Sequence, residues 1–180
     1  MSQGANFKAS LSVQEADFDV GAEIAALSAD RCDVGAVASF VGLVRNLNEG
    51  SGVSAMTLEH YPGMTEKALD EIIQQARQRW SLLAVRVIHR VGRLEPADRI
   101  VFVGVASGHR GEAFAACEFI MDYLKTRAPF WKREETPTGA RWVDARETDD
   151  SAAARWQAAE DAKSVVNEAG VQSGAGERGQ

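Results

Sequence analysis

Hydrophobic and polar residues repeat along this chain with two periods, one of two residues and one of about 3.6 residues. The first is typical of half-buried strands and the second of amphipathic helices. Strand-like runs cover residues 7–14, 34–45, 53–61, 82–92, 99–107, 129–135 and 141–147. Helical spacing covers residues 18–30, 64–80, 108–128 and 150–166.

The predicted elements follow one another in the order β-α-β-β-α-β-β-α-β-β-α, so that strands often succeed each other without a helix between them. This order favours an α+β fold, with a largely antiparallel sheet and flanking helices, over a doubly wound parallel sheet. Residues 99–107 are apolar on both faces and are predicted to form a central strand. Residues 46–52 have the composition of a loop.

Two of the predicted helices have readable ends. The helix over 64–80 follows a Pro-Gly break, and Thr65 is the expected N-cap, without a capping box because Ala68 stands three residues later. The helix over 108–128 stops before Pro129, since the residue before a proline avoids the helical region.

A length of 180 residues suits one domain. We expect that domain to span residues 1–157, with room for a small inserted subdomain around 40–60. Residues 158–180 are expected to form a polar helical extension and a Gly-rich tail without a packed core.

The net charge of −6 and the pI near 5.1 argue against a general nucleic-acid-binding protein. Cys32 and Cys117 form no metal-binding spacing with the histidines, so we expect two reduced cysteines, often buried as small apolar side chains, no metal and no cofactor. The sequence has no signal-peptide pattern and no apolar run long enough for a membrane span, which predicts a cytoplasmic protein.

Against this acidic background, residues 121–135 (MDYLKTRAPFWKREE) contain four cations within nine positions: Lys125, Arg127, Lys132 and Arg133. Such crowding is unfavourable unless water screens it or an anion offsets it. Lys132 and Arg133 alternate on a strand and face opposite sides, so at most one of them shares a pocket with Lys125.

Lys125 has two interpretations. Near the end of a helix it can interact favourably with the helix dipole. Among other cations and partly desolvated, it would have a lowered pKa and act as a nucleophile or general base.

Other candidates are less specific. His109 and Arg110 open a helix and form either an anion site or a solvated turn. Arg45, after a buried strand, and Arg146 are each either anion-binding or solvated surface residues. His60 is either catalytic or structural, whereas His89 alternates with core valines and is interpreted as a satisfied core histidine.

Four segments together resemble the large, catalytic subunit of molybdopterin synthase, over roughly residues 10–157. They are LEHYPGMTEKAL (58–69), VIHRVGRL (87–94), VFVGVASGHR (101–110) and MDYLKTRAPFWKRE (121–134). The resemblance implies an α/β-hammerhead fold and transfer of two sulfurs to a cyclic pyranopterin monophosphate, which makes the dithiolene of molybdopterin. It also implies a ubiquitin-like partner subunit whose C-terminal Gly-Gly thiocarboxylate supplies the sulfur, and a central homodimer of the large subunit within a heterotetramer.

The resemblance implies functional roles for individual residues of this chain. It implies that Lys125 and Lys132 are catalytic, the latter also binding substrate, and that the remaining substrate-binding residues are Arg45, His109, Arg110 and Arg146. In the family, a residue such as Arg146 reaches the neighbouring subunit's pocket. The chain departs from the family pattern at Leu43, where a basic residue is common, at Ser-Gly before His109, and in its longer C-terminal tail.

Two rival functions stay open on the sequence. One is a non-catalytic adaptor that docks a C-terminal tail, a known recognition mode. The other is single-stranded nucleic-acid binding, with bases stacked on Phe130 and Trp131.

Overall fold

The computed structural model describes residues 7–48, 51–143 and 151–158. Its strands are β1 Lys8–Gln14, β2 Ala36–Leu43, β3 Leu47–Asn48, β4 Ser51–Gly52, β5 Ala55–His60, β6 Leu82–Arg90, β7 Gly92–Leu94, β8 Arg99–Ser107, β9 Phe130–Thr136 and β10 Gly139–Val143. Its helices are α1 Val20–Ser28, α2 Met64–Arg79 and α3 Arg110–Arg127, and residues 151–158 are also helical.

The strands form two four-stranded sheets and a short β3–β4 pair. The first sheet has the order β1-β6-β8-β2, in which only β1 and β6 run parallel. The second has the order β10-β9-β5-β7 and is antiparallel throughout. The predicted α+β class, with largely antiparallel sheets and flanking helices, is therefore confirmed, and β8 is the central strand that its two apolar faces indicated.

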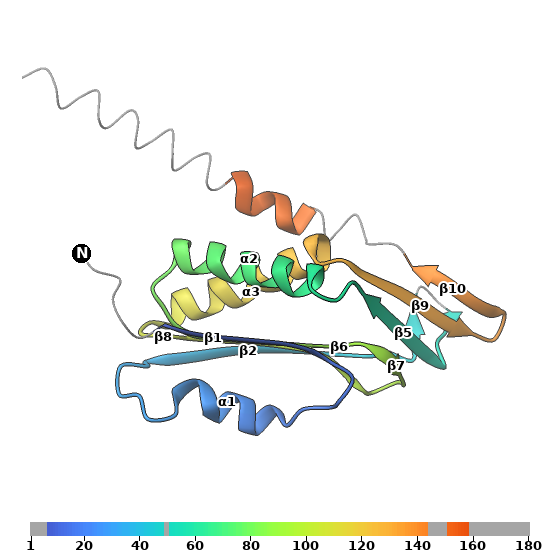
Figure 1. Cartoon of the computed structure of the whole chain (residues 1–180), viewed down its shortest axis with the longest axis horizontal. Helices are drawn as coiled ribbons and strands as arrows, with labels where there is room; N and C mark the ends of the chain where they lie inside the picture. Colours follow the sequence, from blue (N-terminus) through green and yellow to red (C-terminus); the bar gives the residue numbers. More distant parts are fainter. Residues whose placement is uncertain (1–6, 49–50, 144–150, 159–180) are drawn as a thin grey trace, which may run out of the picture.

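The first sheet is covered on both faces (Figure 1). Helices α2 and α3 lie on one face and α1 lies on the other. Side chains of β8 alternate between the two cores, with Val103 under α2 and α3 and Phe102 under α1. At Gly104, on the α1 face, an added Cβ would lie 2.5 Å from Leu27 Cδ1, so the sheet and helix are in close contact there.

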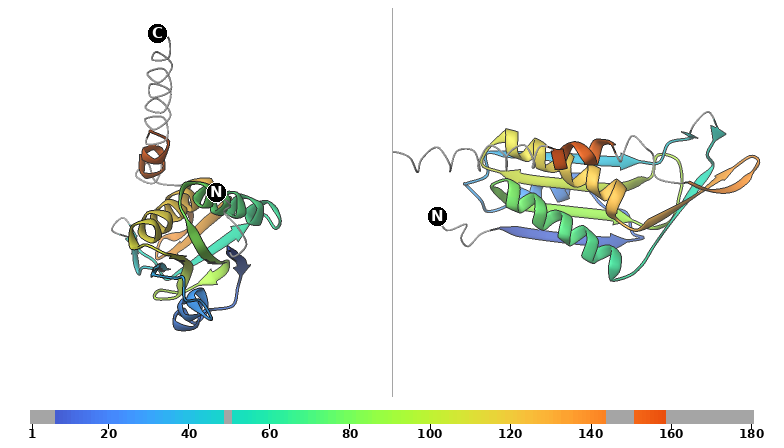
Figure 2. Two further views of the ribbon diagram at one scale, coloured as in Figure 1. Left: turned by 90° about the vertical axis from the view of Figure 1, so that its left-hand side faces the viewer. Right: turned by 90° about the horizontal axis from the view of Figure 1, so that it is seen from above.

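The chain passes from the first sheet to the second at Gly92. The sequence pattern predicted one strand over 82–92, but β6 ends at Arg90 and β7 pairs with β5 in the other sheet. Gly92 has φ +81, a conformation that glycine adopts without steric cost, and this turns the chain. The second sheet thus extends beyond the end of the first, near the end of α3 (Figures 1 and 2).

The predicted cap of α2 is wrong. Gly63 is the N-cap, and its N–H donates to the Glu66 carboxylate at 2.6 Å. Thr65 is instead fully buried, and its hydroxyl accepts from the Tyr61 N–H and donates to the Pro129 carbonyl. This residue therefore joins α2 to the start of β9.

Helix α3 is buried along most of its length, but Phe114 in its first half is 66% exposed. Cys117, Met121 and Leu124, about one, two and three turns later on the same predicted side, are buried.

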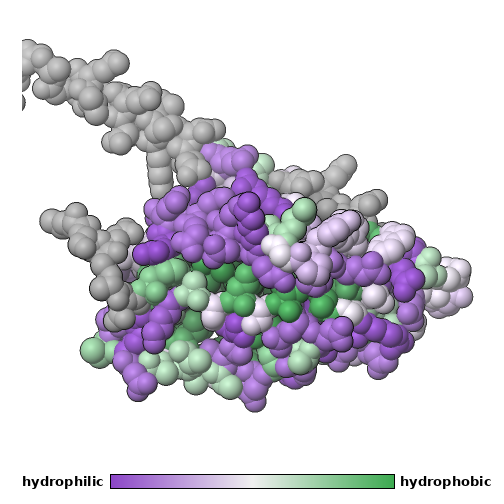
Figure 3. Space-filling model, viewed as in Figure 1, coloured by the Kyte–Doolittle hydropathy of each residue, from purple (hydrophilic) through white to green (hydrophobic). Residues whose placement is uncertain are grey.

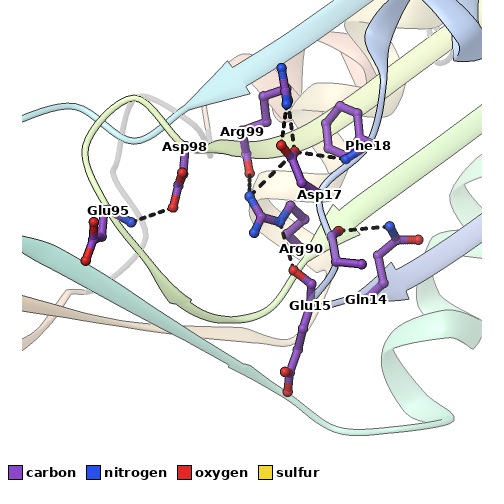
Figure 4. A network of polar contacts seen from close by, with 9 residues as sticks. Gln14, Glu15, Asp17, Phe18, Arg90, Glu95, Asp98 and Arg99 are labelled. Carbon is purple, nitrogen blue, oxygen red and sulfur yellow. Dashed lines mark hydrogen bonds and ion pairs between the residues drawn. The ribbon is translucent and has the colours of Figure 1, made fainter.

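A polar network fastens the β1–α1 connection to the ends of β6 and β8 (Figure 4). Arg90 donates to the backbone carbonyls of Glu15 and Arg99, each at 3.0 Å. Arg99 forms a two-point ion pair with Asp17, whose Oδ1 is 2.8 Å from the Arg99 Nε. These bonds lower the pKa of Asp17 to about 2.

The helix at residues 151–158 packs on α2 and α3 (Figure 2). The Trp156 ring lies 5.7 Å from that of Trp80 and 5.5 Å from that of Phe119, and its Nε1 donates to Asp122 at 2.8 Å. Arg155 adds ion pairs to Glu118 and Asp122. The predictions for 144–150 and 159–180 lie outside the described residues.

Viewed from the side, apolar residues gather in a band at the level of the first sheet, below the polar surface of helix α2 (Figure 3). Within the described ranges, no helix is both long and apolar enough to cross a membrane.

Candidate functional site

A cavity of about 710 Å³ opens where the two sheets meet the end of α3. Its walls come from β2 and the residues after it, from β5, from the ends of β6 and α3, and from β8 and β9. Most of the lining is apolar, with Phe40, Met56, Met121, Leu124 and Phe130 among the larger side chains. A concave, mostly apolar site with a few polar groups suits a small organic ligand.

Three of the predicted cations line this cavity. Arg45 follows β2, Lys125 comes from the last turn of α3, and Lys132 comes from β9. Arg45 is far from the other two residues in the sequence, and the fold brings it to them. Lys125 is exposed, so its own chain does not shield it from water in the way that the catalytic interpretation requires.

The two neighbouring cations of β9 separate as predicted. Lys132 lines the cavity, whereas Arg133 does not and lies over the Trp142 ring, 5.9 Å from its centroid. Arg127 is also directed elsewhere, over the Tyr123 ring at 3.9 Å. Of the four cations clustered in the sequence, only Lys125 and Lys132 line the cavity.

Glu134 also lines the cavity and was not among the predicted site residues. It is 3% exposed, and its carboxylate lies 3.1 Å from the Lys132 Nζ and 3.3 Å from an Arg141 Nη. A buried carboxylate needs such partners, because an isolated buried charge is strongly unfavourable. Its position two residues after Lys132 on one strand was the available signal, since such residues share a face.

His109 and Arg110 do not join this group within one chain. They stand at the start of α3, and Lys125 is fifteen residues further along the same helix. That separation is about 22 Å along the helix axis. Both residues are exposed and neither lines the cavity. Arg146 lies outside the described residues.

His89 lines the cavity as well, at the end of β6. It is 5% exposed, and its ring stacks on that of Phe130 with 3.7 Å between centroids. Burial lowers the pKa of His89 to about 4. The core assignment is thus confirmed, but the sequence pattern did not indicate that this side chain faces a cavity.

His60 is placed near the same aromatic ring, 6.5 Å from Phe130, but does not line the cavity. Its Nδ1 is buried and has no hydrogen-bond partner among the described residues.

The cysteines lie away from this site. Cys117 is buried on α3, where burial raises the pKa of its thiol to about 11. Cys32 is exposed, which differs from the expectation of a buried side chain. Neither lines the cavity.

The chain is similar in sequence to the proteins of one known family. Residues 13–127 match the model of the MoaE protein family. The molybdopterin synthase catalytic subunit of Ralstonia nicotianae is 72% identical over 144 residues, 80% of this chain and 82% of that protein. The chain belongs to the MoaE family.

Solved structures share the fold. The molybdopterin biosynthesis MoaE protein from Burkholderia ambifaria MC40-6 is 59% identical, with a TM-score of 0.72 over 83% of this chain and 98% of that one. A protein–protein complex of subunits 1 and 2 of molybdopterin-converting factor from Helicobacter pylori 26695 has a TM-score of 0.63 over 76% of this chain and 91% of that one. At 17% identity, this last likeness supports the fold alone.

Proposed function

We propose that this chain is the catalytic subunit of a molybdopterin synthase. It takes sulfur from the thiocarboxylated C-terminus of a small ubiquitin-like subunit and transfers it to cyclic pyranopterin monophosphate. Two transfers form the dithiolene of molybdopterin. In each transfer a carbon–sulfur bond forms at the pterin side chain as the acyl carbon–sulfur bond of the carrier breaks. An oxygen from the pterin side chain or from water takes the place of the sulfur, and the carrier leaves as a carboxylate.

The observation that carries this proposal is the meeting of Arg45, Lys125 and Lys132 at one largely apolar cavity. The apolar walls suit a flat fused ring system, and the cations suit its phosphate and the carrier's thiocarboxylate. Arginine pairs with phosphate through a rigid two-point fork, whereas lysine can exchange a proton or form a covalent adduct. We assign chemistry at the reacting carbon to Lys125, and positioning of the substrate or carrier tail to Lys132.

His109 and Arg110 are the remaining substrate-binding candidates on described residues. Because they lie at the far end of α3, they can serve the reaction only in the cavity of a second copy of the chain. This supports a shared site in a central homodimer, with one small subunit at each end of a heterotetramer. Arg146 is proposed for the same shared role. We propose a cytoplasmic location for this assembly.

The test combines purified chain, thiocarboxylated small subunit and cyclic pyranopterin, and measures dithiolene product. The variants are Lys125→Ala, Lys125→Arg and the control Lys67→Ala, an exposed lysine on α2. We expect product from the wild type and the control, and none from either Lys125 variant that folds and binds its partner.

Each other outcome has a defined meaning. Equal product from wild type and Lys125→Ala would remove Lys125 from the mechanism and direct attention to Lys132. Activity retained by Lys125→Arg would show that charge, not a mobile proton, is needed. No product from the wild type would favour the adaptor that only docks a C-terminal tail.

A further inference from the structure

The protonation of His89 is fixed by its backbone contact. Its Nδ1 lies 2.9 Å from the carbonyl oxygen of Arg90, which can only accept a hydrogen bond. Nδ1 therefore carries the proton. A neutral imidazole has one N–H, so Nε2 is left as an acceptor. No residue in the described part of the chain forms a hydrogen bond to that atom.

The ring that carries this acceptor is held rigidly. It stacks on Phe130 with an interplanar angle of 16°, and Phe130 is itself tied by its N–H to the Ala128 carbonyl. Its strand, β6, lies between β1 and β8 and pairs with both. The acceptor thus has a defined direction before a ligand arrives, which lowers the entropy cost of binding.

The other polar side chains of the cavity have different chemistry. Arg45, Lys125 and Lys132 can only donate hydrogen bonds. Glu134 accepts, but its carboxylate already faces Lys132 and Arg141. Among the described lining residues, His89 therefore offers the neutral side-chain acceptor. A ligand with both an anionic group and ring N–H donors would use the cations for the first and needs an acceptor for the second.

We infer that His89 positions the substrate by accepting a hydrogen bond at Nε2 from a ring N–H or amino group of the pterin. Phe130, stacked behind His89, keeps the imidazole in place for this contact. This inference rests on the proposed function and adds recognition of the heterocycle, which the cations do not supply.

Two variants separate the atoms of the imidazole. The amide nitrogen of His89→Asn can take the place of Nδ1 and keep the bond to the Arg90 carbonyl, but it leaves nothing at the Nε2 position. The longer His89→Gln side chain can present its carbonyl oxygen near the Nε2 position. Binding of cyclic pyranopterin monophosphate is measured by fluorescence titration, and sulfur transfer is measured on the same samples.

We expect His89→Asn to raise the Kd about tenfold, the loss of one good hydrogen bond. His89→Gln should stay within about threefold of the wild type, because it restores the acceptor. In turnover, His89→Asn should raise KM and leave kcat largely unchanged. If His89 had a purely structural role, its variants would unfold at a lower temperature. They would not show this difference in Kd between His89→Asn and His89→Gln.

Unchanged Kd in a folded His89→Asn would overturn the inference. If that variant does not fold, His89→Gln decides, and a tenfold loss of affinity in folded His89→Gln would also overturn it. A wild type that binds the pterin but makes no dithiolene would contradict the proposed function while leaving the Kd comparison valid. A wild type that does not bind the pterin would overturn both.

Discussion

The Nζ of Lys132 lies 3.1 Å from the carboxylate of Glu134, two residues along the same face of β9. Lys132 is 31% exposed and Glu134 is 3% exposed, so the acid is the fixed member of the pair. Arg141, directly across the strand pair, holds the carboxylate from the other side. Glu134 thus sets the position of a lysine that faces the cavity.

We therefore predict that Glu134→Gln lowers the kcat/KM of sulfur transfer about tenfold to a hundredfold, since a charge-assisted hydrogen bond contributes about 1.5–3 kcal/mol. The matched control is Glu135→Gln, on the next residue, whose side chain pairs with Arg93 instead. Steady-state kinetics on both variants provides the measurement. Equal activity in the two would show that Lys132 does not need this partner.

The sulfur is predicted to come from the carrier rather than from a cysteine of this chain. A buried thiol with a raised pKa is not a thiolate at neutral pH, and Cys117 has this property. The double variant Cys32→Ala, Cys117→Ala should therefore transfer sulfur within about twofold of the wild-type rate. Loss of transfer in a folded double variant would assign a cysteine to the mechanism.

His89 should also affect stability between pH 4 and 6.5. Its pKa is lowered from 6.5 to about 4 in the folded protein, where the ring faces Phe130 and the Arg90 carbonyl, with His60 nearby. In this range the unfolded chain binds a proton that the folded chain does not, so the free energy of unfolding falls as pH falls. The full effect is about 3 kcal/mol.

Urea unfolding of wild type and His89→Gln at several pH values measures this. The wild type should lose more stability than the variant between pH 6.5 and pH 4. Parallel curves would contradict the assignment.

The Asp17–Arg99 ion pair is predicted to contribute stability above pH 3.8 and to lose it as pH falls towards 2, because the pKa of Asp17 is lowered to about 2. Asp17→Asn should unfold at lower urea than the wild type at pH 6, and the difference should shrink by pH 2. High salt should also reduce it, since Asp17 is about half exposed. The exposed Asp30, outside this network, provides the control Asp30→Asn.

Close contact between β8 and α1 gives a fifth prediction. Gly104→Ala would place a Cβ 2.5 Å from Leu27 and 2.8 Å from the Phe102 ring, and overpacking of this kind costs about 1–3 kcal/mol. In Gly111→Ala, on the first turn of α3, the Cβ would meet no atom within 4 Å, and helix propensity favours alanine there. Thermal unfolding should rank Gly104→Ala below and Gly111→Ala at or above the wild type. The reverse order would contradict this packing.

Local patterns predicted most of the elements, because burial of one face imposes the strand and helix periods on the sequence. The alternation in β9 also predicted that the side chains of Lys132 and Arg133 face opposite sides of the strand. In the structure, only Lys132 lines the cavity. Local patterns do not predict structure that depends on contacts between distant segments. The β6–β7 break depends on pairing of β7 with β5, and the position of Thr65 depends on the carbonyl of Pro129.

The same limit applies to the site. The cationic stretch predicted an anionic ligand. The ion pairs of Glu134 and the hydrogen-bond acceptor of His89 were not predicted, because they depend on residues of other strands and on the cavity itself. His109 and Arg110 belong to the same helix as Lys125 but lie at its other end. They therefore do not reach the cavity that Lys125 lines.

Helix α3 imposes a constraint of length as well as of composition. Each residue advances a helix by about 1.5 Å and turns it by about 100°. A single inserted residue of any type between Arg110 and Lys125 would therefore rotate Lys125 relative to Arg110 and turn it away from the cavity. Between those two positions, the exposed residues should tolerate exchange of their side chains, but no insertion or deletion should be tolerated.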